Sequence, residues 1–307
     1  MASRSLPLPR SLRRRILYPF LAGSAAVLAR VPPRLAYAVT DRLADAAYRL
    51  LPRERARMAA HLAIAFPERT EAERAAIARE TFRHFGRVFV DAARLPAMTA
   101  DEMAEWVRFH DPTGVLETVR RRGQGALGIT AHLGHWELLV ACLSRRGMPC
   151  KAIAKRLRDE RLHEMVVAMR AASGVGTITR DEGARPLLRA LREGFTLGLL
   201  IDQDTDVDGE FVPFFGRPAF TTRAPGVLHL ATGAPVFTAF CVRADDGRYD
   251  VHVEPILPEV PRGLTGEAKA AAARAILVEA TRRIEAAVRR YPTQWVWWHP
   301  RWKTQPT

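Results

Sequence analysis

The sequence predicts an α/β fold, with a mostly parallel sheet flanked by helices and a helical N-terminal extension. Residues 10–98 carry apolar side chains at three- and four-residue spacing, which is typical of amphipathic helices. From about Val107 onward, short apolar runs alternate with helical segments, as in parallel strands covered by helices. With 307 residues, of which 48% are hydrophobic, the chain can bury a full core.

Residues 1–30 form a basic and apolar segment, for which we expect association with a membrane. Four arginines between positions 10 and 15 precede an uncharged apolar run at 16–29. This run is shorter than the roughly 20 residues that span a bilayer. Three interpretations stay open: a signal peptide without a clean A-x-A cleavage site, a core helix, or an interfacial anchor whose arginines meet anionic headgroups.

Residues 31–98 are expected to form a helical N-terminal region. The runs DRLADAAYRLL and RERARMAAHLAIAF have helical periodicity, and TEAERAAIARETFRHFGRVFVDAARL predicts a long amphipathic helix. Thr70 is followed three residues later by Glu73, the pattern of a capping box, which marks the start of that helix. Pro67 and Pro96 punctuate the region.

Residues 99–307 are expected to form the α/β domain. The strand-like runs GALGIT, CKAIAK and FTLGLLI alternate with the helical runs HWELLVACLSRR, RLHEMVVAMRAAS and PLLRALREG. GAPVFTAFCVR and RYDVHVEPIL predict neighbouring strands joined by a turn at residues 245–247. A long helix is expected over roughly 265–290.

The charge of the chain favours an acidic partner. The net charge is +14 and the isoelectric point is about 10.8, which suits nucleic acid, anionic lipid or an acidic carrier protein. Four lysines leave 43 of the 47 basic residues as Arg, a bias that a GC-rich genome also produces. Cys142, Cys150 and Cys241 form no CxxC pair and are typical of buried thiols in a reducing compartment.

The segment GALGITAHLGHWELL places His132, His135 and Glu137 in otherwise apolar surroundings. GALGIT is a predicted buried strand that ends near Thr130, so His132 falls at its carboxyl end, where open α/β sheets bind ligands. A helix is expected to begin around Gly134, with Glu137 in its first turn. A sharp turn can bring this carboxylate to the imidazole of His132, as a general base requires. On spacing alone, a core histidine near a capping carboxylate remains the competing interpretation.

The sequence also narrows the reaction. There is no G-x-S-x-G motif, so a serine hydrolase would lack its nucleophile. Cys142 lies five residues past Glu137, where helix geometry directs it mostly elsewhere, which disfavours a covalent thioester on the protein. His132, His135 and Glu137 lack the H-E-x-x-H pattern and a second ligand cluster, which disfavours a metal site. Direct transfer remains, in which His132 deprotonates a hydroxyl that attacks an activated carbonyl.

Four blocks carry a resemblance to a known family. TAHLGHWE resembles the H-x-x-x-x-D/E block of the lysophospholipid and lipid A acyltransferases, including the phosphatidylinositol mannoside acyltransferases. Three more of that family's blocks are similar to IDQDTDVDGEFVPFFGRPAFT at 201–221, LATGAPVFTAFCVRADDGRYDV at 230–251 and YPTQWVWWHPRWK at 291–303. The blocks run in order over most of residues 55–303.

The resemblance implies a glycerolipid acyltransferase-like fold and an enzyme of lipid A or other glycolipid biosynthesis. Such an enzyme moves an acyl chain from an acyl-carrier-protein or coenzyme A thioester to a hydroxyl of a glycolipid or lysolipid, without a cofactor. The resemblance further implies that His132 is the base and Glu137 its partner. It also implies a peripheral or monotopic location on the cytoplasmic face of the cell inner membrane. The family's lipid A members usually carry a membrane-spanning N-terminal segment, whereas here Pro19 and Gly23 interrupt a short run.

Other residues of these blocks are candidates for substrate binding. Asp202, Gln203 and Asp204 follow a predicted strand and would lie beside the same cleft as His132, unless they only cap the loop. DQDTDVDGE matches the start of an EF-hand loop, but Phe215 stands where the bidentate Glu is required, which disfavours calcium. Phe214 and Phe215 form either the wall of an acyl groove or a plug in the core.

Arg170 and Arg223 flank family-like blocks and are candidates for phosphate or headgroup contacts, since guanidinium groups suit phosphate oxygens. The competing interpretation for each is a solvated surface residue. Four tryptophans in QWVWWHPRW indicate an interfacial belt or, with a slight preference, a C-terminal strand docked in the core.

Two other classes of protein remain open. A nucleic-acid-binding protein would explain the charge, but the chain lacks RRM, KH, zinc-finger and helix-turn-helix patterns. A non-catalytic basic membrane protein would leave His132 and Glu137 unused. We therefore expect an anionic membrane surface as a partner and no nucleic acid.

Overall fold

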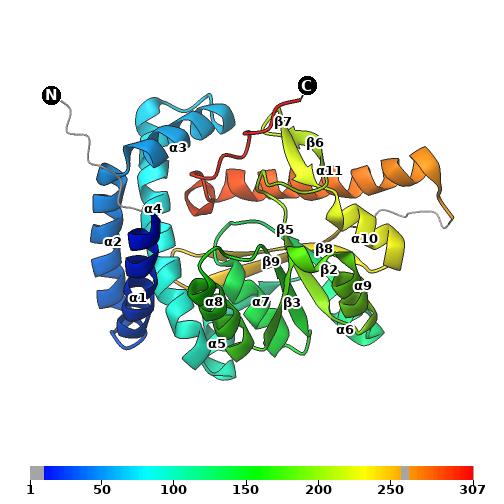
Figure 1. Cartoon of the computed structure of the whole chain (residues 1–307), viewed down its shortest axis with the longest axis horizontal. Coiled ribbons are helices and arrows are strands. Elements are labelled where there is room, and N and C mark those ends of the chain that lie inside the picture. The colour runs from blue at the N-terminus through cyan, green and yellow to red at the C-terminus, as the bar shows by residue number, and fades with distance from the viewer. Residues whose placement is uncertain (1–9, 257–262, 307) are drawn as a thin grey trace.

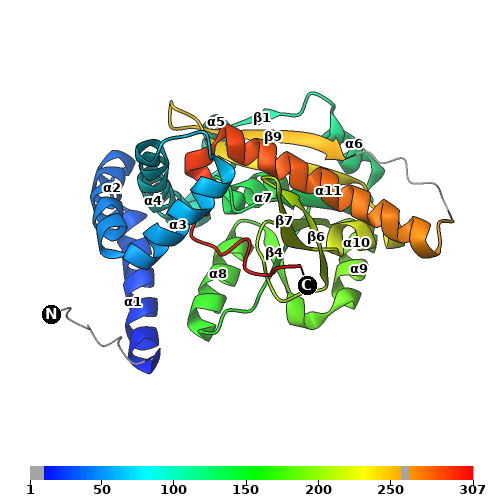
Figure 2. The same ribbon diagram turned by 90° about the horizontal axis from the view of Figure 1, so that it is seen from above.

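The computed structural model describes residues 10–256 and 263–306, with the side chains of residues 10–17 left aside. The expected helical extension is present at one end of the molecule (Figures 1 and 2). It comprises four helices: α1 (Arg10–Leu28), α2 (Pro33–Leu50), α3 (Pro52–Ala65) and α4 (Glu71–Arg94). None of the helices in the described ranges is long and apolar enough to cross a membrane.

Local sequence signals set the ends of these helices. The predicted capping box is confirmed at α4, where the Thr70 side chain accepts from the backbone N–H of Glu73 and the Glu73 carboxylate accepts from that of Thr70. α2 and α3 each begin with a proline, whose missing N–H would have no partner in the first turn. α1 differs from expectation, because it continues through Pro19 and Gly23. A proline removes one backbone hydrogen bond, and the remaining bonds can hold such a helix together.

The rest of the chain forms the expected α/β fold, built on a seven-stranded sheet of order β1-β9-β8-β2-β5-β3-β4. Its strands are β1 (Val107–His110), β2 (Ala126–Thr130), β3 (Cys150–Ala154), β4 (Val175–Thr179), β5 (Thr196–Leu200), β8 (Val236–Arg243) and β9 (Tyr249–Ile256). All pairs are parallel except β8 with β9, which form the predicted neighbouring strands. β6 (Gly209–Phe214) and β7 (Arg217–Thr222) form a separate hairpin that the sequence analysis did not predict.

Helices cover both faces of the sheet, and α11 and α7 lie on opposite sides of it (Figure 1). The helices of this part are α5 (Ala100–Trp106), α6 (Val115–Arg122), α7 (Trp136–Arg145), α8 (Glu160–Ala172), α9 (Ala184–Arg192), α10 (Ala224–Thr232) and α11 (Gly266–Arg290). Strand β2 contributes to two cores, because Leu127 and Ile129 pack with α11 residues while Ala126 packs with α7 residues. A fully buried strand of this kind is typical of parallel sheets.

A buried polar cluster joins the helical extension to the sheet. Asp91 of α4 is fully buried and accepts hydrogen bonds from Tyr37 of α2, Tyr249 of β9 and Arg243 of β8. Burial raises the pKa of Asp91, although the guanidinium and the two hydroxyls counteract this effect. The cluster therefore fixes α2 and α4 against the end of the sheet.

Candidate active site

His132 and Asp202 meet at the carboxyl end of the sheet. β2 and β5 are parallel neighbours, and Thr130 is paired with Leu200 at their carboxyl ends. His132 and Asp202 each follow two residues after this pair. The Nδ1 of His132 lies 2.8 Å from Oδ1 of Asp202, and the backbone N–H of His132 donates to Oδ2 at 2.8 Å. Sequence analysis placed both residues at this edge but did not pair them.

The carboxylate of Asp202 is fixed and charged. The indole N–H of Trp295 donates to its Oδ2 at 2.8 Å, and the side chain is almost completely buried. Burial alone would raise the pKa of Asp202, but the charge on His132 and the hydrogen bonds from His132 and Trp295 outweigh it and lower the pKa. An ionised carboxylate is an acceptor only, so Nδ1–H of His132 donates to Asp202 and Nε2 is the nitrogen that faces away from this contact.

Nε2 of His132 is free to act on a substrate. The His132 side chain is partly exposed, and within the described residues its Nε2 has no hydrogen-bond partner. The ring of Trp136 packs edge-on against the imidazole, with 5.0 Å between ring centroids. A neutral imidazole held on one nitrogen by a carboxylate and open on the other can take a proton from a hydroxyl group.

The loop after β2 is held by backbone contacts on both sides. Gly134 N–H donates to the Gln294 carbonyl and His135 N–H to the Cys241 carbonyl, both at 2.8 Å. Gly134 has φ +62°, and a Cβ there would lie 1.9 Å from the Cys241 oxygen, so only glycine fits. Val296 N–H donates to the His132 carbonyl, which fixes the backbone of the candidate base.

His135 caps the start of α7. Its Nδ1 accepts from the Leu138 N–H at 3.2 Å at the start of α7, and burial lowers its pKa to about 3. The imidazole is therefore neutral at ordinary pH. Within residues 10–256 and 263–306, no cluster of three or more His, Cys, Asp or Glu side chains is placed to hold a metal ion.

Glu137 does not hold His132 as the sequence led us to expect. It lies in the first turn of α7 as predicted, but Arg170 of α8 binds both of its oxygens, at 2.8 and 2.6 Å. The indole N–H of Trp136 donates to the same carboxylate at 3.2 Å. Because Asp202 occupies Nδ1 of the imidazole and Arg170 saturates Glu137, the expected pairing is replaced by two separate pairs. Arg170, expected at a phosphate, is neutralised by this carboxylate.

The neighbours of Asp202 have different environments. Asp204 is buried and accepts from the backbone N–H and hydroxyl of Thr304, at 2.7 and 2.9 Å, so it anchors the C-terminal segment. Gln203 is half-buried and has no hydrogen-bond partner among the described residues. Of the three polar residues predicted here, Asp202 contacts His132, Asp204 is engaged with Thr304, and Gln203 is half-buried without a described partner.

Phe214 and Phe215 lie in the core. Phe214 packs against Trp295 and Trp302, with ring centroids 5.7 and 5.8 Å apart, and Phe215 lies at the tip of the β6–β7 hairpin with φ 51°. Both side chains are buried, which corresponds to the plug and not to the open groove wall. They support Trp295, and through it Asp202.

Arg223 and Arg180 are the remaining arginines of interest. Arg223 precedes α10 and is exposed, and its Nε lies 3.8 Å from Oδ1 of Asp208. Arg180 follows β4 and donates to the Thr205 hydroxyl at 3.1 Å, with no carboxylate partner in the described part of the chain. Sequence analysis missed this residue because it did not recognise β4, although Arg180 follows its strand much as His132 follows β2.

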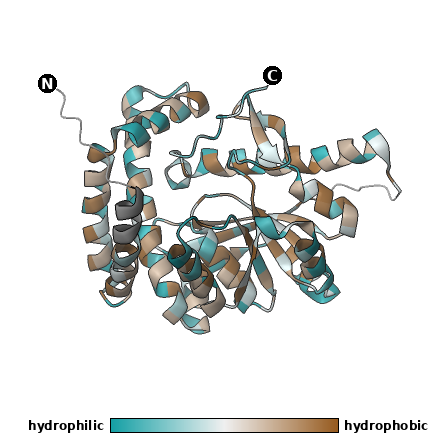
Figure 3. Ribbon diagram, viewed as in Figure 1, coloured by the Kyte–Doolittle hydropathy of each residue, from teal (hydrophilic) through white to brown (hydrophobic). Residues whose placement is uncertain are grey.

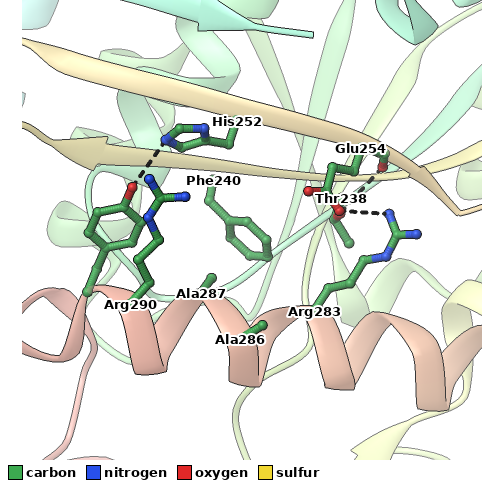
Figure 4. A pocket seen from close by; sticks show the side chains of 9 residues that line it. Thr238, Phe240, His252, Glu254, Arg283, Ala286, Ala287 and Arg290 are labelled. Atoms are coloured by element: carbon green, nitrogen blue, oxygen red, sulfur yellow. Dashed lines mark hydrogen bonds and ion pairs between the residues drawn. The ribbon is translucent and has the colours of Figure 1, made fainter. Parts of the chain in front are cut away.

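A separate cavity of about 170 Å³ lies between α11 and the β8–β9 pair (Figure 4). Tyr291 and His252 meet at one end, 3.3 Å apart, and Arg283 approaches Glu254 at the other, at 3.4 Å. None of the site residues predicted from the sequence lines this cavity. Its charged ends do not suit an acyl chain.

Comparison with known proteins finds a family match and several acyltransferase relatives. A sequence profile of the bacterial lipid A biosynthesis acyltransferase family matches residues 9–304. The phosphatidylinositol mannoside acyltransferase of Mycolicibacterium smegmatis is 27% identical over 228 residues, which cover 73% of this chain and 71% of that protein. The lipid A biosynthesis myristoyltransferase of Escherichia coli is 25% identical over 242 residues, covering 78% and 74%. The lipid A biosynthesis palmitoleoyltransferase of the same organism is 26% identical over 251 residues, covering 80% and 78%.

Proposed function

The chain belongs to the bacterial lipid A biosynthesis acyltransferase family, and we propose that it moves a fatty acyl chain from an acyl thioester to a hydroxyl of a glycolipid or lysolipid. The donor is an acyl-carrier-protein or coenzyme A thioester. As an acyltransferase of the lipid A and glycolipid type, the protein is an enzyme. The alternative hypothesis of a non-catalytic basic binding protein is therefore rejected. The enzyme acts on the cytoplasmic face of the inner membrane, with the bilayer surface as its partner.

His132 is the general base of this reaction. Nε2 takes the proton of the acceptor hydroxyl as its oxygen attacks the thioester carbonyl, and the Asp202 carboxylate stabilises the resulting imidazolium. When the tetrahedral intermediate collapses, the C–S bond breaks and Nε2 returns the proton to the leaving thiolate. The thioester brings its own activation, so the protein needs to supply mainly a base and correct positioning.

Glu137 and Arg170 act as positioning residues. Their mutual ion pair joins α7 to α8, and Glu137 also holds the indole of Trp136, whose ring packs on His132. The pair therefore sets the position of the imidazole without touching the transferred proton. Arg180 and Gln203 bind polar groups of the substrate. Among the described residues Arg180 has no carboxylate partner, and Gln203 has no hydrogen-bond partner.

The observation that carries the proposal is the His132–Asp202 pair with its unoccupied Nε2 at the carboxyl edge of the sheet. The test is transfer of a radiolabelled acyl group by purified protein, with acyl carrier protein and coenzyme A donors compared. Acceptors are a phosphatidylinositol mannoside, a lipid A precursor and a lysophospholipid. We expect transfer to one acceptor class and its loss in His132→Ala. Transfer by His132→Ala at the wild-type rate would refute the assignment.

The location is tested separately. Spheroplasts treated with protease before and after lysis report which side of the inner membrane the protein occupies. We expect sedimentation with the inner membrane and digestion only after lysis. Digestion in intact spheroplasts would contradict the cytoplasmic assignment.

A further inference from the structure

The outer face of α2 carries large apolar side chains that no part of the described protein covers. Leu35, Val39, Leu43 and Leu50 are 56%, 46%, 62% and 76% exposed. Their separations of four, eight and fifteen residues place them on one side of a helix with 3.6 residues per turn. Hydrophobic residues recur along this helix in Figure 3. Single exposed leucines are ordinary, but a continuous apolar stripe marks an interaction surface.

A neighbouring face of α2, about 100° around the helix, accounts for its attachment to the protein. Ala36, Thr40 and Ala44 are buried where α2 packs against α4. The two acidic residues of α2 bind arginines of α4. Asp41 accepts hydrogen bonds from Arg87, and Asp45 accepts them from Arg79 and Arg83. The stripe is therefore not needed for the fold of the extension.

The charge left on the outer face is of one sign. Arg34, Arg42 and Arg49 are exposed, and in residues 10–256 and 263–306 none of them has an acidic partner. By helical spacing they run along one border of the apolar stripe. A helix with an apolar stripe bordered by arginines is typical of helices that lie in the interface of an anionic membrane.

α1 presents a similar face beside it. Phe20 and Val27 are both more than half exposed and are seven residues apart, so they lie on one side of α1, with exposed Gly23 between them. Both helices belong to the end of the molecule formed by the N-terminal extension (Figures 1 and 2). Most of the exposed large apolar side chains of the described residues therefore lie at this end.

We propose that the outer face of α2, bordered by Arg34, Arg42 and Arg49, docks on an anionic lipid bilayer. Its leucines and Val39 enter the boundary between headgroups and acyl chains, while the guanidinium groups bind lipid phosphates. The sequence assigned membrane association to residues 1–30, and this inference assigns the principal docking surface to the next helix. It deepens the proposed function, because a lipid acceptor lies in that bilayer, but it does not depend on His132.

The first test measures binding of the full chain to vesicles of phosphatidylcholine with or without phosphatidylglycerol. We expect selective binding to the anionic vesicles. A variant with Leu35→Gln, Leu43→Gln and Leu50→Gln should lose about 100-fold in partition coefficient. The matched control, Leu157→Gln with Val227→Gln, changes two exposed apolar residues elsewhere and should bind as wild type. Equal binding by the triple variant, or a loss confined to the control, would overturn the proposal.

A second variant tests the charge. Arg34→Gln, Arg42→Gln and Arg49→Gln together should weaken binding to anionic vesicles by about 100-fold, since each cation near the surface contributes roughly fivefold. Binding to neutral vesicles should stay the same. The stripe could instead bind a second copy of the chain. Light scattering would then show a dimer that the leucine variant converts to a monomer, and this result would refute membrane docking. Thermal melts verify that both variants remain folded.

Activity measured in two settings separates this inference from the proposed function. With acceptor in detergent micelles, the leucine variant should transfer acyl groups at the wild-type rate, whereas with acceptor in vesicles its rate should fall with its binding. His132→Ala should be inactive in both settings yet bind vesicles normally. Acyl transfer in vesicles at the wild-type rate by the leucine variant would refute the proposed docking surface and leave the assignment of His132 unaffected.

Discussion

Asp202 lies 70 residues from His132 in the chain and still reaches its imidazole, because β2 and β5 are parallel neighbours in register. Glu137 is only five residues away, yet it faces Arg170 of α8. At the scale of single residues, spacing along the chain therefore singled out His132 as the candidate base but paired it with a carboxylate that faces elsewhere. The partner of a histidine at a strand end is decided by the adjacent strand.

Asp202→Asn is expected to lower kcat about 1,000-fold or more, since an amide cannot stabilise the imidazolium and favours the wrong tautomer. Glu137→Gln keeps one hydrogen-bonding oxygen for Arg170 and should lower kcat by less than about tenfold. Steady-state kinetics of the two variants under identical conditions make the comparison. A larger loss in Glu137→Gln than in Asp202→Asn would restore the pairing expected from the sequence.

Trp295→Phe tests the indole that holds Asp202. The variant keeps the aromatic packing against Phe214 but removes a hydrogen bond to a charged group, so kcat should fall about 10- to 100-fold. A carboxylate with one donor fewer holds the imidazolium proton more tightly, so the acid limb of the pH–rate profile should move to higher pH. A fall in kcat without that movement would indicate a purely structural role.

At the scale of elements, the Asp91 cluster joins α2 and α4 to β8 and β9. Asp91→Ala leaves the guanidinium of Arg243 buried without its carboxylate and is expected to cost about 3–5 kcal/mol of unfolding free energy, measured by urea denaturation. Asp246→Ala removes an exposed partner of Arg248 and serves as the control, with no measurable change expected. If the two variants unfold alike, the cluster does not fasten the extension.

The C-terminal segment is a second element whose role depends on its contacts. Asp204 binds Thr304, and the buried Arg301 donates to the Phe220 carbonyl of β7, so this segment is fastened across the end of the sheet. Trp295 is consequently brought to Asp202. Trp295 and Trp297 are buried, as the docked C-terminal strand predicted, but the described residues after Gln294 form turns and no strand. The contact of Trp295 with Asp202 was not predicted.

At the scale of the whole molecule, buried neutral histidines make the protein sensitive to mild acid. Burial lowers the pKa of His84 and His135 to about 3, and that of His299 to about 4. The unfolded chain gains protons on these groups below pH about 6.5, while the folded chain does not. Stability is therefore greatest above pH 6.5 and falls as the pH is lowered from there toward 3.

His135→Asn isolates one of these groups. Asparagine can still accept from the Leu138 N–H as an N-cap, but it does not titrate. The slope of unfolding free energy against pH between 6.5 and 4.5 should decrease by about 1.4 kcal/mol per pH unit relative to wild type. Urea denaturation across this range measures the slope, and an unchanged slope would show that His135 titrates alike in the folded and unfolded chain.

The sequence by itself determined most of the helices and strands and the place of the candidate base. Helical periodicity, the Thr70 capping box, the strand-like apolar runs and the place of His132 after β2 all depend on residues near one another in the chain, where backbone and side-chain preferences act directly. These local signals were enough to predict the α/β fold and its helical extension.

Only the tertiary structure decided which side chains meet. Strand order placed Asp202 beside His132, the C-terminal segment supplied Trp295, and the hairpin turned Phe214 into the core. The apolar stripe of α2 also stays exposed, because α4 packs against a different face of this helix. Such contacts join residues far apart in sequence, and their free energy depends on the packing of the complete sheet, which no local pattern contains.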